Sequence, residues 1–143
     1  MPVSHIHQLP GWARELTETA PLGHLGFLDD RRLPRVLPVT FAAAGEAFWS
    51  AVDHKPKRVP GRELARVRWL RRNPAAALTV DRYSDDWERL AWVQALGQVE
   101  VLDAPAPAAL EALTAKYAPY REREPAGPFL RLVPERILFW TAT

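Results

Sequence analysis

Near the middle of the chain, an apolar run, Glu46-Ala47-Phe48-Trp49-Ser50-Ala51-Val52, leads directly into a basic segment, Asp53-His54-Lys55-Pro56-Lys57-Arg58. The apolar run is typical of a strand, and residues 61–72 beyond the basic segment are typical of a helix. A strand-to-helix junction suits an anion, because free backbone N–H groups and the positive end of the helix dipole point toward it. Pro56 fixes its own φ and keeps Lys55 extended. The junction therefore predicts an anion site, although a solvated charged turn would have the same sequence.

Composition limits the classes of function. The chain has 143 residues, enough for one domain with a proper core. Its net charge is +2 and its sequence pI is about 9.3, so a local anion site fits better than a general nucleic-acid surface. The absence of cysteine excludes disulfides, thiolate metal sites and cysteine nucleophiles. No apolar run approaches the roughly 20 residues of a membrane span, and a signal-peptide pattern is absent, so a cytoplasmic protein is expected.

The first part of the chain predicts one helix and three strands. Residues 1–9 are expected to form a loose arm, and residues 12–19 a short helix. Strands are predicted at 22–28, 33–42 and 48–53, joined by short polar turns into an antiparallel meander. Pro34 and Pro38 cannot donate ladder hydrogen bonds, so the middle strand should lie at an edge or a bulge.

A helix is predicted over residues 61–72. Leu64, Val67 and Leu70 recur every three residues and form the stripe expected to face the core. Trp69 lies well away from that stripe, among arginines. Two interpretations remain open for it, a tryptophan shielded by arginine stems or a contact between subunits.

The last part of the chain predicts two further strands, a helix and a final strand or two. Strands are expected at 75–83 and 89–102, a helix at 108–117, and the last strands within 129–143, with a possible turn at Pro134-Glu135. Gly97 predicts a bulge or bend. Both faces of 89–102 are mostly apolar, so one should face the core and the other a helix or a second subunit. Six or so strands with intervening helices indicate a mainly-β small barrel, closed or partly open.

Few chemistries other than anion binding are indicated. The sequence contains no Gly-x-Gly-x-x-Gly, Walker-type or Gly-x-Ser-x-Gly motif. His5 and His7 share one side of an extended segment without a further clustered ligand, so no metal site is expected. Cations bind phosphate, and aromatic and apolar strand residues cover a flat ring. Together these features describe a flavin or a deazaflavin, with the basic segment holding its phosphates.

Four motifs in order carry a resemblance to a known family. They are PRVLPVTFA at 34–42, AVDHKPKR at 51–58, LRRNPAAALTVDRY at 70–83 and DDWERLAWV at 85–93. This set resembles the pyridoxamine-phosphate-oxidase-like split β-barrel proteins, and is most similar to the group that depends on the deazaflavin coenzyme F-420. The resemblance covers residues 33–102 closely and the rest loosely. It implies a six-stranded antiparallel split β-barrel of the FMN-binding type, with two or three short helices, formed by residues 1–143 as one domain.

The resemblance also implies a homodimer with cofactor sites at the subunit interface. The cofactor would carry the hydride, and no side chain is identified as a committed acid or base. The implied contacts are Lys55, Lys57 and Arg58 at the phosphate or acidic tail, Pro38, Val39 and Thr40 along the ring edge, Ser50, Ala51 and Val52 on the adjacent wall, and Trp87 from the partner subunit.

The first predicted strand departs from the family pattern. The segment GHLGFLDDRRLP at 23–34 has the bulkier residues Phe27 and Leu28 where this family usually has small ones. Because that strand borders the pocket in this family, cofactor entry is the property affected. A member that has lost its cofactor is therefore an alternative.

The expected function is an oxidoreductase that passes a hydride between reduced coenzyme F-420 and an unsaturated small organic substrate. The first alternative is an FMN-dependent oxidase or reductase of the same fold, and the second is a flavin-binding module without turnover. A barrel that binds nucleic acid through the helix at 62–72 is disfavoured, because 17 acidic residues nearly balance 19 basic ones.

Overall fold

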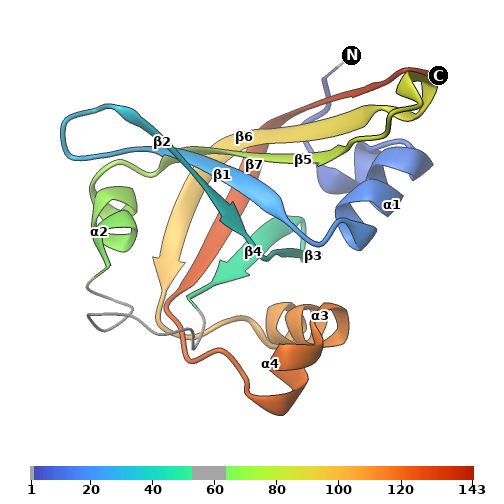
Figure 1. Cartoon of the computed structure of the whole chain (residues 1–143). Coiled ribbons are helices and arrows are strands. Elements are labelled where there is room, and N and C mark those ends of the chain that lie inside the picture. The colour runs from blue at the N-terminus through green and yellow to red at the C-terminus, as the bar shows by residue number, and fades with distance from the viewer. Residues whose placement is uncertain (1, 53–63) are drawn as a thin grey trace.

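The computed structural model describes residues 2–52 and 64–143, which form one antiparallel sheet with helices packed around it (Figure 1). The strands are β1 (Gly23–Leu28), β2 (Pro34–Val39), β3 (Ala42–Ala44), β4 (Ala47–Ala51), β5 (Ala75–Arg82), β6 (Ala91–Leu102) and β7 (Phe129–Thr141). The helices are α1 (Gly11–Thr19), α2 (Ala65–Arg72), α3 (Pro107–Lys116) and α4 (Ala118–Glu122), with short 3-10 helices η1 (Ile6–Gln8) and η3 (Trp87–Arg89). The predicted mainly-β class is confirmed.

Seven strands follow one another in the order β2-β1-β5-β6-β7-β4-β3. Six were predicted, and the additional strand arises because the predicted strand at 33–42 divides into β2 and β3 around Thr40 and Phe41. These two residues can separate Val39 from Ala42 by only about 11 Å, so the sheet must curl until its two end strands approach each other. No ladder joins β2 to β3 in the described residues, which form a curled open sheet rather than the expected six-stranded barrel.

The predicted three-strand meander is wrong beyond its first hairpin. β1 and β2 pair along their whole length, from Gly23 opposite Val39 to Leu28 opposite Pro34. β4 does not pair with β2; its neighbours are β3 and β7. β2 lies at one end of the sheet, the edge position predicted from its two prolines, where a missing N–H breaks no ladder.

β6 and β7 form the longest ladder, and it contains the predicted bulge. The register shifts between Leu96 and Gly97, so that Glu135 on β7 has no opposite residue. The predicted turn at Pro134-Glu135 is wrong, because β7 continues through both residues as one strand. Pro134 is accommodated because β4 pairs with β7 only as far as Leu132, where Phe48 lies opposite it.

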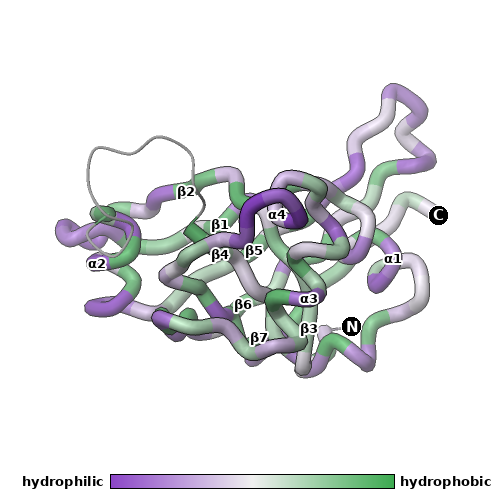
Figure 2. Tube along the Cα trace, turned by 90° about the horizontal axis from the view of Figure 1, so that it is seen from below, coloured by the Kyte–Doolittle hydropathy of each residue, from purple (hydrophilic) through white to green (hydrophobic). Residues whose placement is uncertain are grey.

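The main core lies on the inner face of the curled sheet. Ala91, Val93 and Ala95 alternate with more exposed neighbours along β6, so one face of this strand is buried as predicted. Fully buried side chains such as Val80 and Ile137 pack on the same cluster. Each such side chain contributes roughly 1.5–3 kcal/mol of burial free energy. Figure 2 shows hydrophobic residues along the strands and a strongly hydrophilic segment at α4.

The N-terminal arm is attached to the sheet, so the expectation of a loose arm at residues 1–9 is wrong. Val3 and Ile137 exchange two backbone hydrogen bonds of 3.0 and 2.7 Å. Ile6 in η1 and the following Leu9 are buried in the core. Buried apolar residues thus anchor the arm. Their spacing is too irregular to form a periodic pattern that the sequence would reveal. None of the helices in the described part of the chain is long and apolar enough to cross a membrane.

α2 follows the prediction where the structure describes it. Val67 and Leu70 on the predicted stripe are fully buried. Trp69 is half-buried against the same core, with its ring 6.2 Å from that of Phe27 and under the guanidinium of Arg35, 5.0 Å from the ring centroid. The arginine that covers Trp69 therefore comes from β2, whereas the sequence places this tryptophan among the arginines of its own helix. The alternative of a contact between subunits stays a prediction.

α3 and α4 pack together on the outer side of β3 and β4 (Figure 1). α3 matches the predicted helix, with Leu113 and Ala109 fully buried. Tyr120 belongs to α4 and is buried beside Tyr117, with the two ring centroids 5.6 Å apart. This pair of tyrosines brings two hydroxyl groups to the junction between β2 and β3.

Candidate cofactor site

Thr40 is held by two distant residues at the junction where β2 gives way to β3. Its hydroxyl lies 2.8 Å from the hydroxyl of Tyr120. Its carbonyl accepts a hydrogen bond of 2.7 Å from the hydroxyl of Ser50 on β4. Because Ser50 is only 8% exposed, its hydroxyl needs a partner inside the protein, and this bond provides it. The end of β2 and the end of β4 are thereby fixed side by side.

The backbone of Phe41 is fixed from two directions by the last turn of α3. Its N–H donates to the Tyr117 hydroxyl at 3.0 Å, and its carbonyl accepts from Nζ of Lys116 at 3.0 Å. Nζ also donates to the carbonyl of Thr17 at 3.3 Å, and the Tyr117 hydroxyl lies 2.8 Å from the carbonyl of Pro21. One lysine and one tyrosine therefore join α1, α3 and the β2–β3 junction.

Burial shifts the pKa of both side chains away from the charged form. The pKa of Lys116 falls from its usual 10.5 to about 8, because its ammonium is partly removed from water. Its Nζ also lies over the ring of Phe41, 3.7 Å from the centroid. Burial raises the pKa of Tyr117, which keeps this hydroxyl protonated and able to donate. The junction thus carries an amine whose pKa is about 8.

No motif in the sequence pointed to Lys116, Tyr117 or Tyr120 as residues of this site. Each contacts residues 75 to 80 positions away, and no local spacing or motif encodes such a contact. The only available sign was that two tyrosines and a lysine end an otherwise alanine-rich helical segment.

The inner cavity beside these residues is small. Val39 and Ser50 help to line it, together with core side chains such as Leu25 and Leu78, and its volume is about 20 Å³. That volume holds about one water molecule. A tricyclic ring therefore has no room inside the curled sheet.

The structure brings only some of the predicted ring-edge and wall residues close to one another. Val39, Thr40 and Ser50 meet at the junction, and Ala51 follows as the half-buried last residue of β4. Val52 is buried, and its N–H donates to the carbonyl of Pro128 at 3.0 Å. Pro38 is exposed on β2, opposite His24 of β1. Lys55, Lys57 and Arg58, predicted to hold the phosphate or acidic tail, lie outside the described residues.

Trp87 lies at the other end of the sheet from this junction. It belongs to η3, between Arg82 and Ala91, and is 70% exposed. Ala91 pairs with Thr141 at one end of β7, whereas β4 pairs with residues 129–132 at the other. Trp87 therefore cannot cover the Ser50 wall of its own chain, and its predicted contact from a partner subunit stays a prediction.

The two N-terminal histidines are occupied by other contacts. The His5 and His7 rings stack with centroids 5.4 Å apart, and His7 binds the Glu46 carboxylate through both its ring nitrogen Nδ1 and its backbone N–H. These hydrogen bonds from His7 lower the pKa of Glu46. Within residues 2–52 and 64–143, no three His, Asp or Glu side chains gather as metal ligands would.

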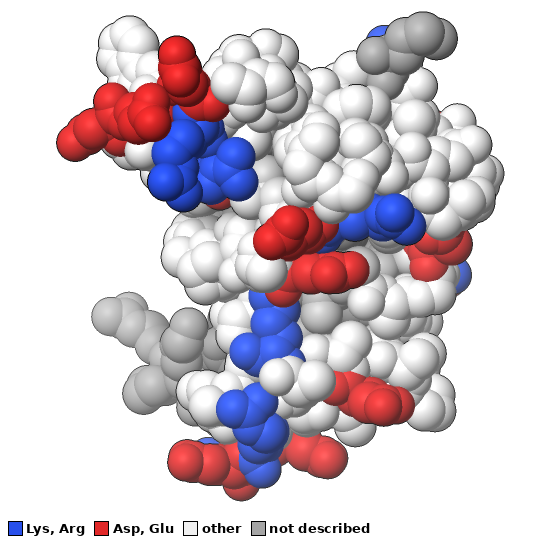
Figure 3. All heavy atoms as spheres, turned by 90° about the vertical axis from the view of Figure 1, so that its right-hand side faces the viewer, with Lys and Arg blue, Asp and Glu red and all other residues white. Residues whose placement is uncertain are grey.

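Surface charges are mixed where they can be seen. On the face shown in Figure 3, Lys and Arg side chains alternate with Asp and Glu side chains. Elsewhere in the described part of the chain, Arg71 and Asp103 form an ion pair with an N···O distance of 3.9 Å, and Arg131 and Glu100 form one of 3.4 Å. A nucleic-acid surface would need a run of cations along the phosphate backbone, and the face in Figure 3 does not offer one.

No protein-family model matches the chain, and no curated protein matches it by sequence. Solved structures match it by shape. A heme-binding protein from Mycobacterium smegmatis aligns at a TM-score of 0.70 and 20% identity, over 90% of this chain and 52% of that one. An FAD-binding protein from Mesorhizobium loti aligns at 0.62 and 18%, over 97% and 95% of the two chains. A Listeria innocua protein, provisionally described as a pyridoxamine 5'-phosphate oxidase, aligns at 0.61 and 18%, over 88% and 93%.

The chain has the pyridoxamine-phosphate-oxidase-like fold. It spans about half the length of the mycobacterial heme-binding protein. Proteins that share this fold with the chain at such low identity are described by different ligands, FAD in one case and heme in another. The fold alone therefore leaves the ligand of this chain to be argued from its own residues.

Proposed function

We propose that the chain is a flavin-binding oxidoreductase domain that holds its cofactor between the β2–β3 junction and the end of β4. The supporting observation is the 2.7 Å hydrogen bond from Ser50 to the Thr40 carbonyl, which fixes the ends of β2 and β4 side by side. The basic segment at 53–58 follows directly from that end of β4. A cofactor with a flat ring and a phosphate would find an apolar strand surface and cations at adjoining positions.

The chemistry in this proposal belongs to the cofactor, which supplies hydride transfer when bound. Val39 and Ala51 would contact the ring, and the Thr40 segment, fixed by Ser50 and Tyr120, would present main-chain groups at a constant position. Lys55, Lys57 and Arg58 would hold the phosphate. Two copies of the chain would form the complete site, with Trp87 of one reaching the other.

A flavin is better supported than a deazaflavin, because an FAD-binding protein and a protein described as a pyridoxamine 5'-phosphate oxidase share the fold, and FMN is the flavin that the sequence resemblance offers. Coenzyme F-420 is kept as the alternative on the sequence resemblance, with an unsaturated small organic molecule as hydride acceptor. A flavin-binding module without turnover is distinguished by a reduced cofactor that no enone or quinone reoxidises.

The test is titration of the purified protein with FMN and with coenzyme F-420, followed by tryptophan quenching. We expect FMN to bind with a micromolar dissociation constant, and the Lys55→Ala/Lys57→Ala double variant to lose at least about tenfold in affinity, since charge-assisted bonds to phosphate contribute roughly 1.5–3 kcal/mol each. Arg14→Ala/Arg123→Ala, which removes two exposed cations elsewhere, is the matched control. Binding of F-420 alone would favour the deazaflavin form, and binding of neither would refute the proposal.

Heme is a second candidate ligand, supported by one specific observation. His24 on β1 is exposed and lies opposite Pro38, one of the predicted ring-edge residues. An imidazole at the edge of an apolar surface is a common axial ligand of heme iron. Titration with hemin should then give a Soret band that the His24→Ala variant lacks, whereas FMN binding by His24→Ala should be unchanged.

A further inference from the structure

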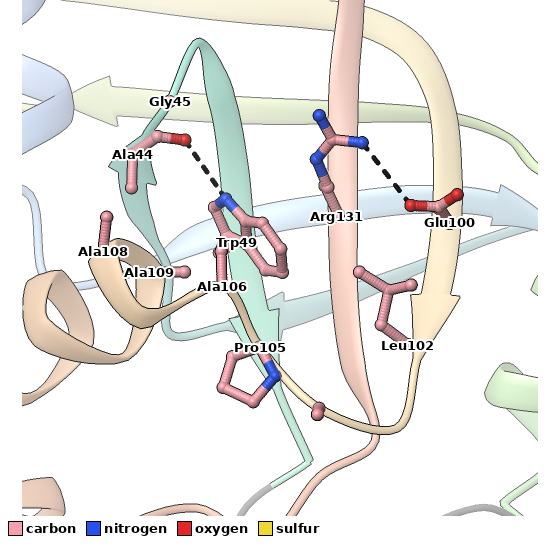
Figure 4. A pocket seen from close by; sticks show the side chains of 11 residues that line it. Ala44, Gly45, Trp49, Glu100, Leu102, Pro105, Ala106, Ala108, Ala109 and Arg131 are labelled. Atoms are coloured by element: carbon pink, nitrogen blue, oxygen red, sulfur yellow. Dashed lines mark hydrogen bonds and ion pairs between the residues drawn. The ribbon is translucent and has the colours of Figure 1, made fainter.

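A second pocket lies on the outer side of the sheet, between the start of α3 and strands β3, β4, β6 and β7 (Figure 4). Its volume is about 320 Å³, at the lower end of the range for small-molecule sites. None of the predicted cofactor residues lines it. Trp49 lines both this pocket and the small inner cavity, whereas Ser50 lines only the inner cavity. The pocket is therefore separate from the candidate cofactor site, although it shares β4 with it.

Most of the pocket surface is apolar and built from small residues. Trp49 stands at its centre and is only 4% exposed. The indole N–H of Trp49 donates to the Ala44 carbonyl at 3.1 Å, so its hydrogen-bonding capacity is satisfied within the protein. The other apolar lining residues are Ala104, Pro105, Ala106, Ala108, Ala109 and Leu102. Short side chains around a flat indole leave space that an uncharged organic group can fill.

One wall of the pocket carries both signs of charge. Nη1 of Arg131 on β7 lies 3.4 Å from Oε1 of Glu100 on β6, its cross-strand partner. The Arg131 guanidinium also lies over the Trp49 ring, 5.8 Å from its centroid. The side chains of Arg131 and Glu100 are 36% and 58% exposed, so each keeps surface that a ligand can contact. Figure 4 shows both beside the indole at the same side of the pocket.

We propose that this pocket binds a small zwitterion, an α-amino acid with an uncharged apolar side chain. A simple anion that approached Arg131 would meet the carboxylate of Glu100, and a simple cation at Glu100 would meet Arg131. A ligand with a carboxylate and an ammonium on one carbon satisfies both groups at once. Its side chain then lies on Trp49 and the alanines, where burial of apolar area adds affinity.

The first experiment compares ligands by isothermal titration calorimetry at low ionic strength. L-Leucine is matched with isocaproate, which lacks its ammonium group, and with isoamylamine, which lacks its carboxylate. We expect L-leucine to bind at least about tenfold more tightly than either analogue, since each loses one charge-assisted bond. Equal affinity for L-leucine and isocaproate, or no heat from L-leucine, L-methionine and L-phenylalanine at millimolar concentration, would overturn the proposal.

The second experiment tests whether L-leucine binds in this pocket, by substituting the two charged residues that line it. Arg131→Gln and Glu100→Gln should each weaken L-leucine binding at least about tenfold. Arg35→Gln, which opens the ion pair between Arg35 and Asp29 at the β1–β2 hairpin, away from the pocket, should leave the affinity unchanged. Unchanged affinity in both pocket variants would contradict the assignment.

Filling the pocket tests it without removing a charge. Ala108 is exposed at the start of α3 and lines the pocket, so Ala108→Trp should abolish L-leucine binding. Ala115 is exposed near the end of the same helix and does not line the pocket, so Ala115→Trp should bind like the wild-type protein. Binding by Ala108→Trp at wild-type affinity would refute this location. FMN titration of the same variants separates the outcome from that of the proposed function.

Discussion

Lys116 is the one lysine within residues 2–52 and 64–143, and it occupies a partly buried position. Its Nζ joins the carbonyls of Thr17 and Phe41, so it fixes α1 and the β2–β3 junction to the end of α3. The neutral amine can still donate to both carbonyls, whereas the ammonium form also loses part of its hydration. The same contact is therefore more favourable after the proton has left.

The lowered pKa of Lys116 predicts a rise in stability with pH. Between its folded pKa of about 8 and its usual 10.5, the unfolded chain binds the proton and the folded chain does not. The free energy of unfolding must then increase across this window. The raised pKa of Tyr117 acts in the opposite direction only from about pH 10 upward, the usual value for tyrosine. Urea denaturation at pH values from 7.5 to about 9.5 should show wild type gaining stability relative to Lys116→Met.

The control for this prediction is Arg121→Met. Arg121 also donates to two backbone carbonyls, those of Thr114 and Ala115, both at 2.9 Å. A guanidinium does not titrate in this range, so the difference between wild type and Arg121→Met should stay constant. A constant difference for Lys116→Met as well would show that its amine is charged throughout.

The sequence grouped residues of neighbouring strands that lie together in the structure, but it did not indicate the side chains that hold them in place. Thr40 and Ser50 were expected at one site, and they share a hydrogen bond. Tyr117 and Tyr120 could not be predicted there, because their position depends on how α3 and α4 pack against β3 and β4. Such contacts follow from the tertiary fold and leave no periodic pattern in the sequence.

The ladder between β6 and β7 depends on Gly97, where its register shifts. A Cβ atom at Gly97 would collide with the backbone carbonyl oxygen of Val133, and would lie 3.0 and 3.1 Å from the Val133 carbonyl carbon and the Pro134 Cα. The obstacle is backbone, which cannot rotate aside as a side chain can. The bulge therefore needs glycine for close approach of two strands.

Gly97→Ala should lower the free energy of unfolding by about 2 kcal/mol or more, because the two central strands must move apart. Gly11→Ala is the control, since a Cβ at this first position of α1 meets nothing within 4 Å. That variant should be unchanged or more stable by up to about 1 kcal/mol. Denaturant unfolding of the two variants measures both effects. If Gly97→Ala were as stable as Gly11→Ala, the backbone of β7 at Pro134 could move aside at little cost.

Hydrophobic periodicity predicted α1, β5 and β6 well, because each has one regular buried face. It failed at 33–42, where the residues remain strand-like throughout. At the break, Ser50 and Lys116 donate hydrogen bonds to the carbonyls of Thr40 and Phe41, and the Phe41 N–H donates to the Tyr117 hydroxyl. An interruption of this kind belongs to the tertiary structure, so the division into β2 and β3 was beyond local reasoning.

The outer face of the β6–β7 ladder exposes large aromatic side chains. Trp92 and Trp140 lie opposite each other and are 36% and 43% exposed, and Val133 on the same strand as Trp140 is 39% exposed. Single exposed apolar residues are ordinary, but paired tryptophans on one sheet face form a patch. Such a patch is typical of an interface, and it lies where the sequence predicted a helix or a second subunit.

We therefore expect a dimer in solution, measured by sedimentation equilibrium at micromolar concentration. Trp92→Glu and Trp140→Glu place a charge in the patch and should shift the protein toward the monomer. Leu33→Glu, at a 56% exposed leucine between β1 and β2, adds the same charge elsewhere and should leave the dimer intact. A wild-type protein that sediments only as a monomer would remove the predicted interface and its role in the cofactor site.

Sequence reasoning identified the fold through four ordered motifs and missed the strand order. The motifs at 34–42, 51–58, 70–83 and 85–93 predicted a pyridoxamine-phosphate-oxidase-like fold, which solved structures support. The pairing of β4 with β7 joins Phe48 to Leu132, and no local feature of the sequence indicates a contact across that distance. The basic segment at 53–58 lies outside the described residues, so its role rests on the cofactor titration.

A flat ribbon of strands leaves a row of unsatisfied amides along each border, open to recruitment of further chains. In this protein the two border strands, β2 and β3, are consecutive, and Thr40 and Phe41 tether one to the other. This short connection keeps the two border strands close to each other. A single proteolytic cut at Thr40 or Phe41 would release both border strands from each other. We expect the cut protein to self-associate into ordered aggregates before it unfolds.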